Sequence, residues 1–368
     1  MELNPARQLR YAVIGVGASV FSMHRQALAL PSIQVVAVSD IVPTVGEQRA
    51  SELHCAFYAD HKRLLAEVHP DVAVVMTPHP FHASIAIDCL AAGSNVLVEK
   101  PMAVQVAEAD AMLAASTEHQ RLLGVIFQQR LRPQVRAART LIQSGQLGHI
   151  QHIDMTAVWT RTARYYRSAS WRGTWSGEGG GVLMNQAPHQ LDMLCHLVGL
   201  PARVFAWTRR LLHSIETEDT VQAALEWPDG ALGSLHISTA EADRAEYLKI
   251  VGTRGQLELE EGKITLRKLD ADLVEFIATS PKAMDAPKML DLAVELEPGK
   301  GDHAAVYQAF NAALLQGIPF TSAGPEGRMS LELANALIYS NYTHQPVELP
   351  LDRQKYAALL EELRTGSA

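Results

Sequence analysis

The sequence predicts an α/β protein: a doubly wound parallel sheet is followed by a second α/β domain with a large, mostly antiparallel open sheet. Two observations support this fold class, namely the alternation of strand-like and helix-like segments in the first third and a change of pattern near residue 149. A chain of 368 residues also favours two domains over one. We expect a first domain over residues 1–127 and a second over residues 128–368.

In the first third, short runs of β-branched residues alternate with Ala-rich segments of helical pattern. The strand-like runs are almost continuously apolar, which is typical of parallel strands that helices cover on both faces. The expected strands are residues 11–14, 35–39, 72–76, 96–98 and 122–127, and the expected helices between them include residues 84–92 and 108–115.

From about residue 149 the strands are separated by tight-turn signals such as Pro228-Asp229-Gly230, which stands between residues 220–227 and 231–238. Such turns join neighbouring antiparallel strands, so this part predicts a meander. Further turn signals lie at residues 252–255 and 261–263, residues 280–301 read as a loop, and helical patterns cover residues 303–316, 326–342 and 352–364.

Composition excludes several classes of protein. The chain has 32 Lys and Arg against 40 Asp and Glu, without a basic run, so a nucleic acid is not an expected partner. No segment reaches the roughly 18 uninterrupted apolar residues of a membrane span. The three cysteines, Cys55, Cys89 and Cys195, are widely spaced among apolar neighbours, which predicts buried thiols in the cytoplasm rather than disulfides.

A glycine turn follows the first expected strand. Gly15 and Gly17 fit the turn of a dinucleotide-binding Rossmann fold, in which the backbone approaches the pyrophosphate at a helix N-terminus. Asp40 lies 23 residues beyond Gly17 and is placed to accept from the adenosine ribose, and its charge repels a 2'-phosphate, which favours NAD over NADP. Val20 stands where the third glycine is expected, which predicts a helix slightly further from the strand.

Two later loops should face the same crevice, because ligands of open α/β sheets bind outside the carboxyl ends of the strands. Thr77-Pro78-His79-Pro80 ends one expected strand, and Glu99-Lys100-Pro101 ends the next. Three apolar residues precede Glu99 and a proline fixes the backbone after Lys100, so we expect a held lysine rather than a solvated one. The cofactor contacts expected from this domain and its flank are Gly15, Gly17, Ser19, Val20, Asp40, Thr77, Pro78, His82, Glu99, Lys100, Gln128, Trp171 and Arg172.

A glycine-led helix with a polar stripe is expected at residues 179–192, GGGVLMNQAPHQLD. One side of this helix carries four polar residues, Asn185, His189, Asp192 and His196. Such a stripe can be a solvent-exposed face, part of an active site, or a metal centre. Zinc helices place their histidines at i and i+4, a spacing that is missing here, so we expect no metal. Upstream, Trp171 and Arg172 either fill a core or form a wall beside the cofactor or a sugar.

These residues together resemble the Gfo/Idh/MocA family of sugar and cyclitol oxidoreductases, which includes glucose-fructose oxidoreductase and inositol dehydrogenase. The matching motifs, in order, are GVGASVFSMH at 15–24, VSD at 38–40, TPHPFH at 77–82, EKP at 99–101 and GGGVLMNQAPHQLD at 179–192. The resemblance covers essentially the whole chain. It implies a Rossmann domain followed by an α/β domain whose open sheet commonly forms oligomer contacts, and a segment after the sixth strand in which Arg130 reaches the cofactor cleft.

The resemblance also implies catalytic roles. Lys100 is the lysine that contacts the reacting hydroxyl, and His189 is the histidine of the catalytic pair. Asn185 stands where the family often has an aspartate, so an amide there can orient a group but cannot take a proton. Asp192 either supports His189 from one turn away or only solvates the helix.

The expected activity is NAD-dependent oxidation of a secondary hydroxyl of a sugar, glycoside or cyclitol. One alternative is a glycosidase that oxidises its sugar transiently and restores it, with no net redox change. Another is a non-catalytic sugar or NAD sensor, although binding alone requires neither Lys100 nor His189. An exposed face of an open sheet is a liability unless it is paired, so we expect a homodimer or homotetramer.

Overall fold

The computed structural model describes residues 8–242 and 246–366. The described residues divide into two compact units: the first contains residues 8–131, 176–179 and 301–331, and the second contains residues 132–175, 180–242, 246–300 and 332–366. The single boundary expected after residue 127 lies close to the first of these crossings. It does not, however, describe the return of residues 301–331 to the first unit.

The first unit contains a six-stranded parallel sheet in the order β3-β2-β1-β4-β5-β6. This is the doubly wound order, in which the chain reverses direction between β1 and β4 and leaves a crevice at their carboxyl ends. The strands are β1 (Leu9–Ile14), β2 (Ile33–Ser39), β3 (Ala56–Tyr58), β4 (Val72–Val75), β5 (Asn95–Val98) and β6 (Leu123–Val125).

Helices connect these strands and bury their apolar faces against the sheet. They are α1 (Phe21–Leu28), α2 (Pro43–Leu53), α3 (His61–Val68), α4 (His82–Ala91) and α5 (Val106–Glu118). A later helix, α11 (His303–Gln316), packs on α1 and adds Val306, Tyr307 and Phe310 to the same core. The expected helix at residues 303–316 therefore forms, but it completes the first unit rather than the second.

The second unit contains a nine-stranded sheet in the order β14-β13-β12-β11-β7-β10-β9-β8-β15. Its strands are β7 (Ile150–Val158), β8 (Arg203–Arg209), β9 (Thr220–Glu226), β10 (Leu232–Ser238), β11 (Tyr247–Gly252), β12 (Gly255–Glu260), β13 (Lys263–Leu269), β14 (Met289–Leu292) and β15 (Val347–Glu348). Only β7 and β10 pair in parallel among these strands, so the expected mostly antiparallel sheet is confirmed. The strand β14 lies inside the region expected to be a loop.

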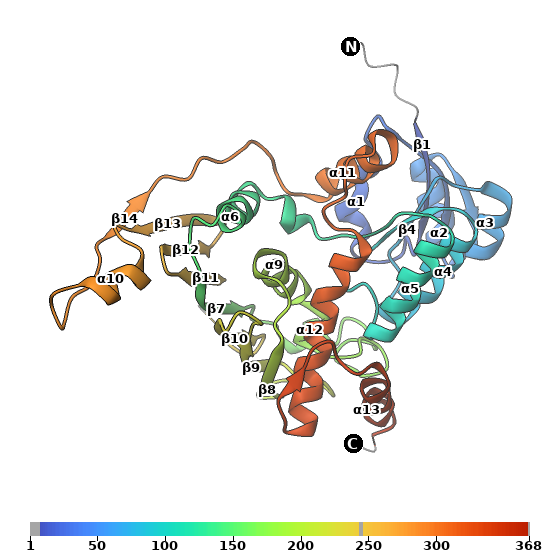
Figure 1. Cartoon of the computed structure of the whole chain (residues 1–368). Coiled ribbons are helices and arrows are strands. Elements are labelled where there is room, and N and C mark those ends of the chain that lie inside the picture. Colours follow the sequence, from blue (N-terminus) through green and yellow to red (C-terminus); the bar gives the residue numbers. More distant parts are fainter. Residues whose placement is uncertain (1–7, 243–245, 367–368) are drawn as a thin grey trace, which may run out of the picture. The chain divides into compact units, whose positions relative to one another are not determined.

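Helices α6 (Pro133–Gln143) and α9 (Pro188–Val198) pack against each other in this unit, and α6 also contacts β12 and β13 (Figure 1). The unit further contains α7 (Ala163–Tyr166), α8 (Val182–Asn185), α10 (Leu273–Thr279) and α13 (Arg353–Thr365). Helix α12 (Gly324–Thr343) begins in the first unit and ends in the second.

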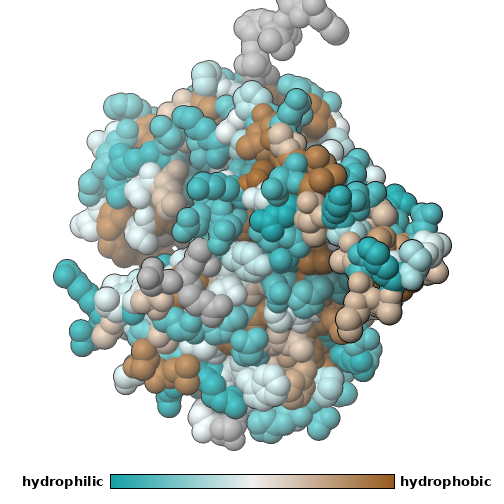
Figure 2. Space-filling view, turned by 90° about the vertical axis from the view of Figure 1, so that its left-hand side faces the viewer, coloured by the Kyte–Doolittle hydropathy of each residue, from teal (hydrophilic) through white to brown (hydrophobic). Residues whose placement is uncertain are grey.

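The surface drawn in Figure 2 is mostly hydrophilic, with hydrophobic residues in separate groups. Within the described residues, no helix has both the length and the apolar character needed to cross a bilayer. All three cysteines are free thiols, and Cys89 and Cys195 are buried as expected, whereas Cys55 is half-buried.

Candidate active site

The turn after β1 leaves no room for a side chain. Gly15 has φ +89°, and a Cβ there would lie 2.8 Å from the backbone N of Thr77 and 2.9 Å from its Cγ2. Only glycine accommodates both the positive φ and this close approach. Two strand ends, those of β1 and β4, are therefore brought together at the point where the fold class binds its ligands.

Asp40 completes this turn. Its Oδ2 accepts a hydrogen bond from the Gly17 N–H at 2.7 Å and its Oδ1 accepts from the Val42 N–H at 2.9 Å. The side chain is partly exposed, so it keeps lone pairs for a ribose hydroxyl.

The residues around this turn fit a dinucleotide. Helix α1 has no side-chain cap on its N-terminal N–H groups, since its N-cap is Val20. Uncapped N–H groups at a helix start attract a pyrophosphate. Ser19 beside it is exposed, and the Thr77 hydroxyl is buried without a hydrogen-bond partner among the described residues, so a ligand oxygen would satisfy it.

We expect Asp40→Ser to raise the KM for NAD by about tenfold or more, because a charge-assisted hydrogen bond contributes about 1.5–3 kcal/mol. The same change should raise the use of NADP relative to NAD, because it removes the negative charge that repels a 2'-phosphate. Steady-state kinetics with both cofactors measures this. Glu47→Gln, an exposed charge removal on α2, is the matched control and should leave both values unchanged.

Lys100 follows a carboxylate that is held from three sides. Glu99 is 5% exposed, and its Oε1 lies 2.9 Å from Nε2 of His24 and 3.8 Å from Nε2 of His303. Its Oε2 accepts the backbone N–H of Lys100 at 3.1 Å. The hydroxyl of Tyr307 lies 2.8 Å from Nδ1 of His24, and if it donates there, His24 donates to Glu99 from Nε2. The backbone that carries Lys100 is thereby fixed to α1 and α11.

The electrostatics of this cluster depend on the two imidazoles. Burial by itself raises the pKa of Glu99, but the hydrogen bond from His24 and the nearby ring of His303 outweigh it and hold that pKa well below its ordinary value. His24, Glu99 and His303 are also the one group within the described residues whose ligand atoms are close enough to hold a metal ion. Hydrogen bonding accounts for the contacts of the Glu99 carboxylate with His24 and with the Lys100 N–H.

Glu99→Gln should destabilise the protein by about 3–5 kcal/mol, because removing one partner of a buried ionic network leaves the others uncompensated. The low pKa of Glu99 predicts the pH dependence: its stabilisation is complete above the ordinary carboxyl pKa near 4.5 and is lost as pH falls toward the lowered value. Thermal unfolding of the wild type and the variant from pH 7 to 3 measures both effects. The variant should show a shallower acid-side slope than the wild type, and Glu67→Gln, an exposed control, should nearly keep the wild-type slope.

His82 ties the two loops together. Its Nδ1 lies 2.8 Å from the carbonyl oxygen of Pro101 and its Nε2 lies 2.6 Å from that of Thr77. The side chain is buried, and burial lowers its pKa, so a neutral ring donates to one carbonyl at a time. His82 thus joins the loop of Thr77 to that of Pro101, and its contact with the cofactor stays a prediction. Pro78 is exposed on the first of these loops.

The segment after β6 differs from the expectation. Gln128 begins a short 3-10 helix, Gln128–Leu131, and is half-buried. Arg130 is 2% exposed, bonds to Glu326 at 2.8 Å and donates to the Thr321 carbonyl. The expectation that Arg130 reaches the cofactor cleft is wrong, because its guanidinium binds Glu326 of α12 and the Thr321 carbonyl.

In the second unit, a glutamate holds the glycine-led turn. Glu218 is 4% exposed, and its Oε1 accepts the N–H groups of Gly181 at 2.9 Å and Leu183 at 3.1 Å. Its backbone carbonyl accepts the Val182 N–H at 3.0 Å. A Cβ on Gly181 would lie 1.9 Å from that carbonyl oxygen, so the close approach requires glycine. This contact starts α8, which ends at Asn185.

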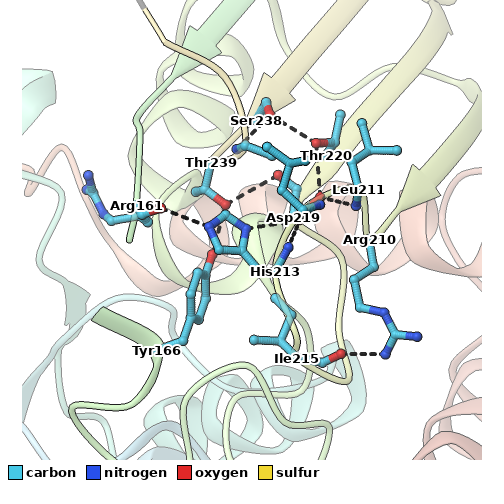
Figure 3. A network of polar contacts seen from close by, with 12 residues as sticks. Arg161, Tyr166, Arg210, Leu211, His213, Ile215, Asp219, Thr220, Ser238 and Thr239 are labelled. Atoms are coloured by element: carbon cyan, nitrogen blue, oxygen red, sulfur yellow. Dashed lines mark hydrogen bonds and ion pairs between the residues drawn. The ribbon is translucent and has the colours of Figure 1, made fainter. Parts of the chain in front are cut away.

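A second acid anchors the loop that leads to Glu218 (Figure 3). Asp219 is fully buried and accepts the N–H groups of Leu211, Leu212 and His213 at 2.8–3.0 Å. The ring of His213 lies 3.0 Å from Asp219 and 2.8 Å from the Arg161 carbonyl. Burial raises the pKa of Asp219, but these hydrogen bonds bring it below its ordinary value.

Helix α9 carries His189 and is buried on nearly all sides. Asp192 is 1% exposed and His196 is 6% exposed, so the reading of this stripe as a surface face is wrong. Nη1 of Arg139 lies 3.0 Å from Nδ1 of His196, and the positive charge of the guanidinium disfavours a metal cation at His196. A supporting role for Asp192 toward His189 stays a prediction.

Tyr165 links three residues near the start of α9. Its hydroxyl donates to Oδ1 of Asn185 at 3.1 Å and accepts from Nη1 of Arg172 at 2.7 Å and Nε2 of Gln186 at 2.8 Å. The Arg172 guanidinium also lies 4.5 Å from the ring centroids of both Tyr165 and Trp171. Asn185 and Arg172, expected at the site on separate grounds, are therefore joined through a residue that the sequence did not single out.

Sequence reasoning missed most of these supporting residues. Glu218 lies more than 30 residues from the turn it holds, and nothing in its neighbourhood indicates that contact. His24 belonged to a matching motif but was assigned no role. Tyr165 stands in an aromatic and basic stretch, which was the one signal that could have indicated it.

Comparison with known proteins agrees with this arrangement. Residues 9–127 match the model of the oxidoreductase family with an NAD-binding Rossmann fold, and residues 135–258 match the Gfo/Idh/MocA C-terminal domain. A bovine (Bos taurus) relative, trans-1,2-dihydrobenzene-1,2-diol dehydrogenase, is 28% identical over 68% of this chain and 74% of its own length.

Solved structures agree as well. The WlbA dehydrogenase of Bordetella pertussis, crystallised with NADH and UDP-GlcNAcA, is 27% identical with a TM-score of 0.81 over 94% of this chain and 99% of that one. A levoglucosan dehydrogenase in complex with NADH and levoglucosan, 21% identical with a TM-score of 0.78 over 93% and 100% of the two chains, shows the same fold. The chain belongs to the Gfo/Idh/MocA family of oxidoreductases and contains its NAD-binding Rossmann domain.

Proposed function

We propose that this protein is an NAD-dependent dehydrogenase that oxidises a secondary hydroxyl of a sugar, glycoside or cyclitol. The observation that supports it most is the held position of Lys100, whose N–H is bonded to the buried Glu99 carboxylate beside the dinucleotide turn. Contacts from two helices thus fix the backbone that carries Lys100 at the carboxyl end of a strand, which a solvated loop lysine would not need.

In the proposed mechanism, Lys100 and His189 act on one hydroxyl. His189 takes the hydroxyl proton, and the Lys100 ammonium stabilises the negative charge that develops on oxygen and then polarises the carbonyl product. Asn185 orients a substrate group without taking a proton. Gly15, Gly17 and Asp40 would hold NAD, which when bound would supply the acceptor for the hydride that leaves the carbon. The proton passes from His189 to solvent.

The test is turnover of purified protein with NAD, followed by the near-ultraviolet absorbance of NADH. The compounds are neutral sugars, sugar acids, sugar nucleotides, glycosides, inositols and levoglucosan, and the whole set is repeated with NADP. Reduction of NAD with one chemical class supports the proposal. Release of an aglycone without net NADH, from protein that already carries cofactor, would replace it with the redox-neutral glycosidase.

We also propose a cytoplasmic homodimer or homotetramer. The three cysteines are free, as in a reducing compartment. All four residues of the terminal strand β14 are exposed, and an exposed apolar edge strand usually pairs. Sedimentation equilibrium measures the mass, and a monomer at micromolar concentration would refute this assembly.

A further inference from the structure

An acidic chain concentrates arginines in one short stretch. The protein carries a net charge of −8, yet residues 155–177 contain four arginines and no Asp or Glu. These arginines are Arg161, Arg164, Arg167 and Arg172, on and around α7. Local charge of one sign raises the local concentration of ligands of the opposite sign.

Three of these arginines have no carboxylate partner in the described part of the chain. Arg161, Arg164 and Arg167 form no ion pair with any residue in 8–242 or 246–366, whereas arginines elsewhere, such as Arg203 with Glu226, are paired. The buried acid Asp219, whose partner His213 also bonds the Arg161 carbonyl, is satisfied by three backbone N–H groups and by His213. In Figure 3 the Arg161 side chain points away from that network.

Two of the guanidinium groups gather around one ring. The Cζ of Arg172 lies 4.5 Å and that of Arg161 lies 5.4 Å from the ring centroid of Tyr165. The ring attracts each cation, but the two cations repel each other, and a bound anion removes that repulsion.

Arg172 is held in place. Its Nε donates to Ser168 Oγ at 3.1 Å, its Nη1 donates to the Tyr165 hydroxyl at 2.7 Å, and the Trp171 ring lies against it. A guanidinium that is already ordered loses little conformational entropy when it binds a planar or tetrahedral oxyanion.

The same cluster adjoins the start of the catalytic helix. Tyr165 bonds Asn185 and Gln186, and His189 follows one turn later. The Oε1 of Gln186 is buried and has no hydrogen-bond donor among the residues that the structure describes. A ligand hydroxyl next to an anionic group would satisfy Gln186, and the anionic group would pair with Arg161.

We infer that the alcohol substrate carries an anionic oxygen group, a carboxylate or a phosphate, and that Arg161 and Arg172 bind it. This inference rests on the proposed function, of which it narrows the substrate class. It places the charged group beside Tyr165 and the reacting hydroxyl on the side of Asn185.

The first test is binding and needs no turnover. Protein saturated with NAD, which occupies the other oxyanion-binding turn, is titrated calorimetrically with inorganic phosphate, with acetate and, as the uncharged probe, with D-glucose. We expect one of the two anions to bind, which identifies the source of the negative charge. Arg161→Gln and Arg172→Gln should each weaken that binding about tenfold, Arg172→Lys less, and Arg254→Gln, an exposed arginine of the large sheet, not at all.

Two results would overturn the inference. One is binding of neither anion, or binding that the variants at 161 and 172 weaken no more than Arg254→Gln does. The other is turnover that favours neutral alcohols over their carboxylate or phosphate analogues in the substrate screen. The second result would leave the dehydrogenase proposal intact, whereas anion binding without any NAD reduction would refute only the dehydrogenase.

Discussion

Lys100→Met should lower kcat by at least a hundredfold and leave the affinity for NAD nearly unchanged. Removal of one preorganised donor from a developing oxyanion costs about 10²–10³ in rate, and here the donor also carries a full charge. Methionine keeps the length and apolar stem of lysine, so the Glu99 bond to the backbone N–H at position 100 survives. Turnover of the compound found in the screen gives kcat, and quenching of protein fluorescence gives the NAD affinity.

Lys62→Met provides the matched control for this change. Lys62 is an exposed lysine of the same unit, with a side chain 67% exposed, and it lies on α3. Lys62→Met should change neither kcat nor the affinity for NAD. If Lys100→Met instead weakens NAD binding as much as it lowers kcat, Lys100 is a cofactor ligand and not the group that stabilises the alkoxide.

The strands of both sheets could be predicted wherever the local pattern was complete. Apolar runs placed β1, β2, β4, β5 and β6, and the turn Pro228-Asp229-Gly230 predicted the antiparallel pairing of β9 with β10. These features depend on residues that are adjacent in sequence, so the chain alone contains the information.

Other elements could not be predicted from the sequence, because their stability comes from partners far away in the chain. β3 is three residues long and β14 is four, so both are too short to show a periodic pattern. The return of residues 301–331 to the first unit depends on contacts such as that of the Tyr11 hydroxyl with Asn311, 300 positions away. No periodicity encodes such a contact.

In the candidate site, too, some residues could be predicted from local sequence, whereas others depend on distant contacts. Its glycines, Asp40 and Lys100 stand at strand ends, where their role follows from the fold. The residues that hold them, Glu218 for the glycine turn and His303 for Glu99, come from elements far along the chain. A sequence therefore predicts what a site contains better than what fixes it.

Gly181→Ala should unfold the start of the catalytic helix and lower the stability of the protein by about 3–5 kcal/mol. The φ of Gly181 is negative, at −102°, so the main cost of an alanine comes from the 1.9 Å approach of its Cβ to the Glu218 carbonyl oxygen. Relief of that clash separates residues 181–183 from Glu218 and breaks up to three hydrogen bonds, each about 0.5–1.5 kcal/mol, in addition to overpacking of about 1–3 kcal/mol.

Gly145→Ala isolates the cost of backbone strain, because it introduces no steric clash. Gly145 lies in the same unit with φ +71°, and no atom lies within 4 Å of the position that an alanine methyl group would take, so alanine there costs backbone strain alone, about 1–2 kcal/mol. Thermal unfolding compares the two variants, and hydrogen exchange over residues 180–198 locates the damage. Fast exchange confined to Gly181→Ala, with loss of turnover, is the expected result. Equal destabilisation by both variants would mean that Glu218 yields to the methyl group, and that the glycine-led turn is not what holds His189 in place.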